Sequence, residues 1–215
     1  MPYLITVQYP YQYLTVTLSD NTSIISTETI SKFQAVGSLI PTIQQLLVSN
    51  NLALTDISCI GINTGPGPFN TLRSIIATAN GISFAKQIPL VSCNGLELLL
   101  QENEITNQVA ILDAFGSDAY YAIKKSQEQG YNSITEIIAK LNDEYATETI
   151  DFIGNGAIKY KEIIAQSFTG VAQFNDEHLF ASPQQLVNET YKKFSQNITE
   201  KEIFPLYFAS PVVKS

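Results

Sequence analysis

The residues best suited to chemistry lie in a loop rich in glycine and proline, Thr64–Pro68, in the first half of the 215-residue chain. A glycine loop that leads into the N-terminus of a helix can bind a phosphate or a carboxylate through backbone N–H groups. Pro66 and Pro68 each remove one such group, and the Lys-Ser or Lys-Thr pair of a P-loop does not follow. Two interpretations stay open: an anion site, or a sharp turn for which Gly65 and Gly67 supply the backbone freedom.

Few other groups in the chain suit nucleophilic or metal catalysis. His178 is the single histidine, and no nucleophile-elbow spacing occurs around it. A peptidase that binds zinc through two histidines four residues apart is therefore excluded. Cys59 and Cys93 are expected to be buried small hydrophobic residues rather than a disulfide or metal ligands. Asp113 and Asp118 could act as paired carboxylates in acid–base or metal chemistry, or they could cap the backbone of a hairpin turn.

Composition limits the partners. Twelve Lys and Arg residues against twenty Asp and Glu residues give a net charge of −8, which repels a phosphate backbone, so direct binding of nucleic acid is not expected. The sequence contains neither an apolar run of membrane-spanning length nor an N-terminal signal pattern, which predicts a cytoplasmic protein without a membrane partner.

The loop must be positioned by a predicted strand before it and a helix, Pro68–Lys86, after it. Residues with helical spacing divide this helix into an apolar stripe and a face of small residues. One face could pack on a sheet and the other on a partner, or both could be ordinary core. An amphipathic helix is also predicted over Gln34–Ser49. The apolar stripe consists of Leu72, Ile75, Ile76, Ala79 and Ile82, and the small face of Asn70, Ser74, Ala77, Thr78, Gly81 and Ala85.

The sequence predicts an α/β protein that could be one large domain or two small lobes. A polar cluster places the boundary between lobes of residues 1–103 and 104–215, and the last helix and tail could return to the first lobe. Ser182 and Pro183 are typical of a helix start. The predicted strands are Tyr3–Gln8, Tyr13–Leu18, Thr22–Glu28, Val109–Leu112, Tyr120–Ile123 and Ile150–Ile153, with further helices over Ile134–Leu141 and from Gly154 to Ile164.

The segment Thr64–Arg73 resembles the Gly-Pro-Gly-Ser-Phe-Thr-Gly-Leu-Arg signature of the bacterial TsaB (YeaZ) family, with Pro68, Asn70 and Thr71 replacing the Ser, Thr and Gly of the signature. Leu39–Ile43 is similar to the Leu-Leu-Pro-x-Ile segment of the family. The resemblance implies an actin-like (ASKHA, ribonuclease H-like) fold with two lobes, each built from a mixed sheet flanked by helices.

The chain departs from the pattern of the family at charged positions. Gln8 stands where the first hairpin of actin-like enzymes carries an Asp, Phe115 stands where the family has Arg, and Ala209 replaces a closing Arg. Gln cannot act as a base or hold a divalent cation by charge. Together with the resemblance, these losses imply that no residue of the chain is catalytic.

The resemblance implies a non-catalytic accessory subunit that binds and supports TsaD, with the ATPase TsaE, in threonylcarbamoyl transfer to the adenosine beside the tRNA anticodon. It implies no cofactor for the chain alone, with ATP and Mg²⁺ only at a complex interface. A homodimer through the same helices is a competing state. The residues expected at the partner interface are Leu39, Ile43, Asn70, Arg73, Ser74, Ala77 and Gly81.

Two alternatives stay open. One is a nucleotide-binding regulator, or an ATPase- or kinase-like protein of the same fold. It would use Gly154, Asn155 and Gly156, which resemble the adenosine-contacting turn of actin-like folds, although a strand-to-helix turn needs glycines whatever it binds. The other alternative is a diverged paralogue that has changed its partner.

Overall fold

The computed structural model describes residues 2–9, 11–100, 105 and 107–208. They form two compact units. The first contains the described residues up to Gly95 together with Ser182–Leu206, and the second contains those from Leu96 to Ala181 with Tyr207 and Phe208. The predicted boundary at residues 103 and 104 lies outside the described residues. The last helix of the chain belongs to the first unit.

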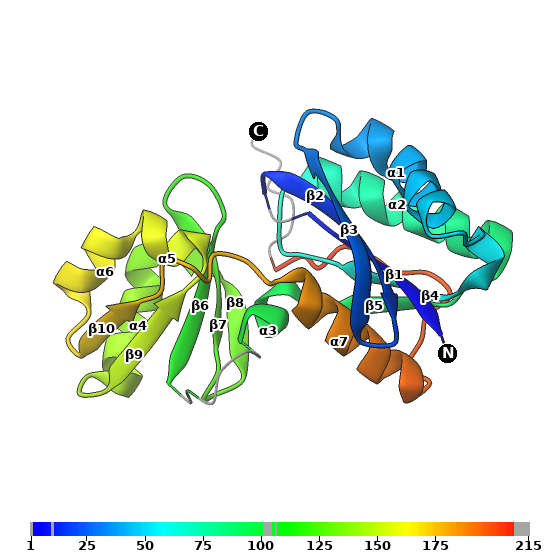
Figure 1. Ribbon diagram of the computed structural model, residues 1–215. Coiled ribbons are helices and arrows are strands. Elements are labelled where there is room, and N and C mark those ends of the chain that lie inside the picture. Colours follow the sequence, from blue (N-terminus) through cyan, green and yellow to red (C-terminus); the bar gives the residue numbers. More distant parts are fainter. Residues whose placement is uncertain (1, 10, 101–104, 106, 209–215) are drawn as a thin grey trace. The chain divides into compact units, whose positions relative to one another are not determined.

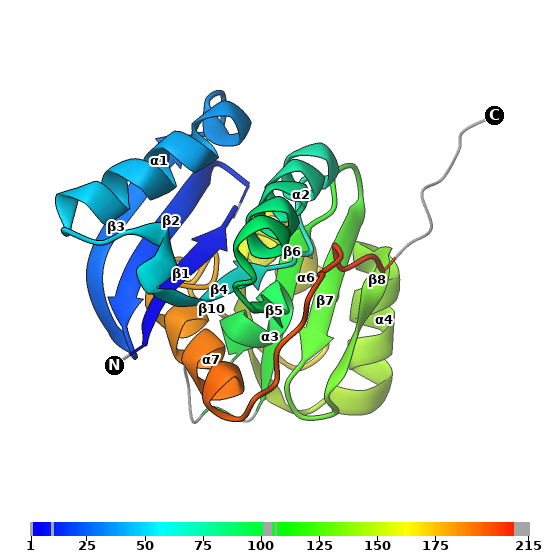
Figure 2. The ribbon, with the colours of Figure 1, turned by 90° about the vertical axis from the view of Figure 1, so that its right-hand side faces the viewer.

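A mixed sheet of five strands, in the order β3-β2-β1-β4-β5, organises the first unit. Strands β1 to β3 are antiparallel neighbours, and β1, β4 and β5 run parallel. Helices α1 and α2 cover one face of the sheet and α7 covers the other, as Figures 1 and 2 show. The bounds are β1 Tyr3–Gln8, β2 Tyr13–Asp20, β3 Ser23–Ser31, α1 Ala35–Ser49, a 3₁₀ turn Leu54–Asp56, β4 Ile57–Asn63, α2 Phe69–Lys86, β5 Leu90–Cys93 and α7 Pro183–Ser195.

The two faces of this sheet differ in chemistry because side chains alternate along each strand. On β1, Ile5 and Val7 belong to the apolar core beneath α1 and α2. Thr6 pairs in register with Gly61 of β4, and Gly61 lies against Thr190 of α7, so the opposite face of β1 looks toward α7. That face contains a buried polar layer. Its members on β1 and β2 are Thr6, Gln8, Thr15, Thr17 and Ser19.

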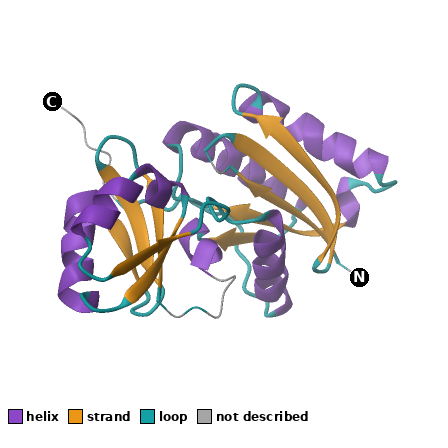
Figure 3. Cartoon of the chain, turned by 60° about the vertical axis from the view of Figure 1, so that its left-hand side comes forward, coloured by secondary structure: helices purple, strands orange, loops and turns teal. Residues whose placement is uncertain are grey.

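The second unit contains a second five-stranded mixed sheet, in the order β10-β9-β6-β7-β8. Its core joins apolar residues of the sheet to those of α4 and α6, and Figure 3 shows the helices beside the strands. The single helix predicted from Gly154 to Ile164 is divided into two at Tyr160. The bounds are α3 Gly95–Leu100, β6 Gln108–Asp113, β7 Asp118–Ile123, β8 Glu128–Ser133, α4 Ile134–Tyr145, β9 Thr149–Ile153, α5 Asn155–Lys159, α6 Lys161–Ser167 and β10 Val171–Phe174.

Within the described part of the chain, no helix is both long enough and apolar enough to cross a membrane.

Candidate protein-interaction surface

Helix α2 buries its apolar stripe and exposes its small residues. Leu72, Ile75, Ile76 and Ala79 pack in the core of the first unit. On the opposite side Asn70, Arg73, Ala77 and Gly81 are exposed and Ser74 is half-buried. One face is therefore core and the other is open, and the interpretation that both are core is wrong.

The middle of the exposed face of α2, around Ala77 and Gly81, is smooth, and the hydroxyl groups beside it are hydrogen-bonded within the helix. The Ser74 hydroxyl donates to the Asn70 carbonyl at 3.0 Å, and the Thr78 hydroxyl donates to the Ser74 carbonyl at 2.9 Å. A Cβ atom added at Gly81 would meet no atom of the described residues within 4 Å. Another helix could therefore approach this face closely, because nothing large projects from its centre.

Helix α1 presents a different set of residues from the one that the sequence suggested. Leu39 is 2% exposed and Ile43 is 6% exposed, and both pack in the core of the first unit. They lie on the stripe that α1 lays on the sheet, so little of either side chain is exposed, although Ile43 also lines the floor of a groove beside α2. The large apolar residues that α1 does expose are Val36, Ile40 and Val48.

The exposed side of α1 adjoins α2 at a groove that Ile82 of α2 closes. The two helices lie side by side. The groove, of about 410 Å³, is lined by Ile40, Ile43, Gln44, Leu47 and Val48 of α1, by residues 52–54 and by Ile82 of α2. Phe84, near the end of α2, is 82% exposed. We call this area the α1–α2 surface. It comprises Val36, Ile40, Gln44, Val48, Asn70, Arg73, Ser74, Ala77, Gly81 and Phe84.

The glycine–proline loop is tied to its own chain. The Gly65 N–H donates to Asn63 Oδ1 at 3.0 Å, and the Gly65 carbonyl accepts from the Gly95 N–H at 2.7 Å. Gly65 has a φ of 106°, and a Cβ atom there would lie 2.8 Å from Leu72 Cδ2. Glycine is therefore required by the turn itself. Of the two interpretations of the loop, this geometry favours the sharp turn.

The turn at Gly154, Asn155 and Gly156 is occupied in a similar way. The Gly154 N–H donates to the His178 carbonyl at 2.8 Å, and the Asn155 N–H donates to the Leu179 carbonyl at 3.0 Å. A Cβ atom on Gly154 would lie 2.3 Å from the Ile111 carbonyl oxygen. Close packing against β6 thus explains the glycine, and the N–H groups that could reach a phosphate bond residues 178 and 179 instead.

Each of the two aspartates at the β6–β7 turn has a partner of its own. Asp113 Oδ1 lies 2.7 Å from Lys159 Nζ and raises the pKa of that lysine. Asp118 accepts a hydrogen bond from the Tyr131 hydroxyl, which raises the pKa of Tyr131 to about 12. Between them Phe115, 62% exposed, has a φ of 68°. Asp113 Oδ1 also accepts a hydrogen bond from the Phe115 N–H at 2.9 Å, which supports the turn-capping interpretation for Asp113, whereas the Asp118 carboxylate bonds the Tyr131 side chain.

The chain matches the model of the family described as "TsaD: tRNA N6-adenosine threonylcarbamoyltransferase" over residues 30–203. The chain belongs to this family. The tRNA threonylcarbamoyladenosine biosynthesis protein TsaB of Escherichia coli is 28% identical over 108 residues, which is 47% of this chain and 47% of that protein. The TsaB protein of Buchnera aphidicola is 27% identical over 188 residues, 79% of this chain and 80% of its own length. The alignment thus spans about half the length of the Escherichia coli TsaB protein.

Solved structures agree with this assignment at the level of the fold. YeaZ from Pseudomonas aeruginosa superposes with a TM-score of 0.71 at 21% identity, over 96% of this chain and all of that one. A second Pseudomonas aeruginosa structure, described as similar to peptidase YEAZ, gives 0.76 at 19% identity, over 97% and 100%. The chain is a divergent TsaB (YeaZ) member of the family with an actin-like fold of two lobes, as the resemblance implied.

The first hairpin of this TsaB-like chain is filled. Gln8 is 3% exposed and Tyr9 is 5% exposed, and burial raises the pKa of Tyr9; Pro10 and Ala209 lie outside the described residues. The position that the resemblance assigns to a metal- or phosphate-directed Asp therefore holds a buried neutral amide.

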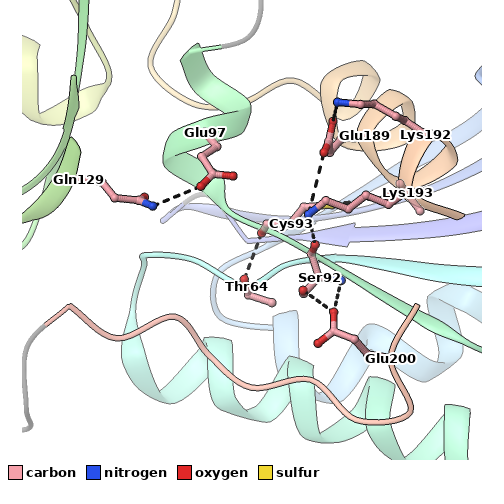
Figure 4. A network of polar contacts seen from close by, with 10 residues as sticks. Thr64, Ser92, Cys93, Glu97, Gln129, Glu189, Lys192, Lys193 and Glu200 are labelled. Carbon is pink, nitrogen blue, oxygen red and sulfur yellow. Dashed lines mark hydrogen bonds and ion pairs between the residues drawn. The ribbon is translucent and has the colours of Figure 1, made fainter. Parts of the chain in front are cut away.

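A polar network that no sequence pattern indicated fixes β5 (Figure 4). Ser92 donates to the Glu200 carboxylate from its N–H and its hydroxyl, and Lys193 Nζ donates to the Ser92 carbonyl at 2.9 Å. Burial raises the pKa of the Cys93 thiol to about 11 and that of the Cys59 thiol to about 12. Both thiols are free and buried, as predicted. No residue type marks this network in advance, because Glu200 and Lys193 are distant from Ser92 in the sequence.

Proposed function

We propose that this chain is a non-catalytic subunit in tRNA threonylcarbamoyladenosine biosynthesis, which binds a TsaD-type catalytic subunit through the α1–α2 surface. The observation that carries the proposal is the exposed face of α2. Small residues occupy its centre at Ala77 and Gly81, and large apolar side chains, such as Ile40 and Phe84, are exposed around it. Exposed apolar residues gathered on one surface are typical of a protein-interaction site.

The non-catalytic part of the proposal is supported by the state of the candidate chemical groups. Gln8 is buried and neutral, Asp113 and Asp118 are engaged at a turn, and the raised pKa values of both cysteines keep the thiols protonated near neutral pH. The chain contributes a binding surface, and the chemistry belongs to its partner.

The charge of the chain fits this division. At −8 the chain does not supply the electrostatic attraction that binding of tRNA requires. We infer that the basic surface for tRNA belongs to the TsaD-type subunit, and that a TsaE-type ATPase, with ATP and Mg²⁺, acts only on the assembled complex. A homodimer through the same helices is the competing state.

The test is complex formation with the TsaD protein of the same organism, measured by size exclusion with light scattering. Gly81→Arg is expected to abolish the complex while leaving the fold intact, because the new side chain enters open space and Arg favours a helix over Gly by roughly 0.8 kcal/mol. Gly81→Ala should bind normally. Gln166→Arg, which adds the same charge to the exposed surface of α6 in the other unit, is the matched control. Normal binding by Gly81→Arg would refute the proposed surface.

The alternative, a nucleotide-binding regulator, predicts a different result when the isolated chain is tested for nucleotide binding. Titration of the isolated chain with ATP and Mg²⁺ by calorimetry should give no heat of binding, because the N–H groups of the Gly154 turn are already hydrogen-bonded. Saturable binding by the chain alone would favour the regulator.

A further inference from the structure

The two helices of the α1–α2 surface differ in charge from the rest of the chain. Helix α1 has 15 residues and none is charged; helix α2 has 18, of which only Arg73 and Lys86 are charged. All twenty acidic residues of the chain lie outside both helices. The two helices therefore carry a charge of +2 in a chain whose net charge is −8, and the exposed carboxylate beside the groove is that of Asp56, which accepts from the Ala53 N–H.

The two cations are available to a partner. Arg73 and Lys86 are both exposed, and the Arg73 guanidinium lies 4.9 Å from the centre of the Phe69 ring. In the part of the chain that the structure describes, no carboxylate forms an ion pair with either of them. Arg73 is the more informative of the two, because it lies one helical turn from Ala77 and two turns from Gly81, on the exposed face of α2.

We propose that the α1–α2 surface selects a heterologous helical surface that carries at least one carboxylate opposite Arg73 and an apolar side chain opposite the groove at Ile40 and Val48. This inference rests on the proposed function and names the chemistry of the partner. Small residues allow the partner helix to approach closely, the groove accepts an apolar side chain, and Arg73 fixes the register by charge.

A second copy of the chain fits this surface less well. A two-fold dimer places the same patch on both sides of the interface. Each patch would contribute Arg73, and neither α1 nor α2 contains an acidic residue to pair with it. Self-association through this surface would bring like charges together, so added salt would not weaken it, whereas salt weakens a pairing of opposite charges.

The test compares the affinity of the TsaD protein of the same organism for the wild-type chain and its charge variants at about 50 and about 500 mM NaCl, where screening of exposed charges differs strongly. Arg73→Glu should weaken binding by about tenfold at low salt and Arg73→Gln by about threefold, with both differences shrinking at high salt. Lys161→Glu, on α6 of the other unit, makes the same charge change elsewhere and should bind like the wild type.

The outcomes separate this inference from the proposed function. If Gly81→Arg abolishes binding and Arg73→Glu changes neither the affinity nor its salt dependence, the surface is used but the carboxylate partner is refuted. If neither substitution matters, or if no complex forms at all, the proposed function fails and this inference fails with it. The wild-type chain could instead self-associate. If high salt weakened that self-association and Arg73→Glu abolished it, the preference for a heterologous partner would also be overturned.

Discussion

Replacing Gly61 on β4 should destabilise the first unit, because α7 packs directly on this position. An ideal Cβ atom at Gly61 would lie 2.0 Å from Thr190 Oγ1, 2.5 Å from Thr190 Cγ2 and 2.8 Å from Thr190 Cβ. Thr190 is fully buried. Rotation of the threonine side chain cannot remove the contact with its Cβ atom, so Gly61→Ala requires α7 to move away from the sheet.

The expected cost follows from overpacking of a well-packed core, which typically lowers the free energy of unfolding by about 1–3 kcal/mol. We expect about 2 kcal/mol for Gly61→Ala, because all three contacts come from one side chain and a small shift of α7 relieves them together. Gly37→Ala on α1 is the control. A Cβ atom there meets no described atom within 4 Å, and Ala favours a helix, so this variant should be neutral or slightly stabilised.

The decisive assay is a double-mutant cycle in urea, followed by circular dichroism. Thr190→Ala removes Oγ1 and Cγ2, which make the two shortest contacts, but loses buried packing of its own. The two substitutions together should therefore cost about 1–2 kcal/mol less than the sum of the single variants. Costs that simply add would refute the reasoning, since they would mean that the Cβ atom introduced by Gly61→Ala never meets Thr190. Binding to TsaD should survive, because α7 and the α1–α2 surface lie on opposite faces of the sheet.

Two further predictions concern the buried thiols and the start of α7. The pKa values of Cys59 and Cys93 are raised to about 12 and about 11 from an ordinary value of 9.0. As the pH rises, the two thiols therefore ionise at a lower pH in the unfolded chain than in the folded chain. Their contribution to stability is complete below pH 9 and is lost as the pH rises toward 11–12. The urea concentration at the unfolding midpoint should decrease as the pH is raised from about 8 to about 10.5. The decrease should be smaller in a Cys59→Ala/Cys93→Ala variant. An equal decrease in both proteins would contradict this prediction. Ser182 caps α7, because its hydroxyl accepts from the Gln185 N–H at 3.2 Å while Gln185 Oε1 accepts from the Ser182 N–H. Ser182→Ala should therefore lower the free energy of unfolding by about 1 kcal/mol. Ser182→Asp should restore most of that stability.

The sequence was informative wherever a local rule decides the structure. Strand β1 has the predicted bounds, and α7 begins at the predicted cap with Pro183 in its first turn. The division of α2 into an apolar and a small face was also visible from spacing alone. These features depend on side-chain periodicity and on backbone rules of neighbouring residues, which a single sequence contains.

The sequence was misleading where packing partners decide. Leu39 and Ile43 have the spacing of an amphipathic stripe, but the same spacing marks a core and an interface, and only the sheet beneath α1 determines that they are core. Strand β8, Glu128–Ser133, was not predicted because the segment contains no apolar aliphatic residue. It pairs with β7 at the edge of the second sheet through its backbone and through polar and aromatic side chains, such as Tyr131 with Asp118 and Glu128 with Tyr121, which a pattern of apolar alternation does not reveal.

The packing of α1 and α2 on the sheet also determines which of their side chains a partner can contact. Both helices rest on the apolar face of the first sheet, where Leu39, Ile43 and Ile75 are buried. Turning either helix to present those residues would expose several of them, at roughly 2 kcal/mol for each large side chain. Under the proposed function a partner must therefore bind the exposed face as it stands, and substitutions at Arg73 and Gly81 should weaken binding without destabilising the chain. The proposed interface predicts that affinity depends on small size at Gly81 and on positive charge at Arg73, two properties that can be altered one at a time.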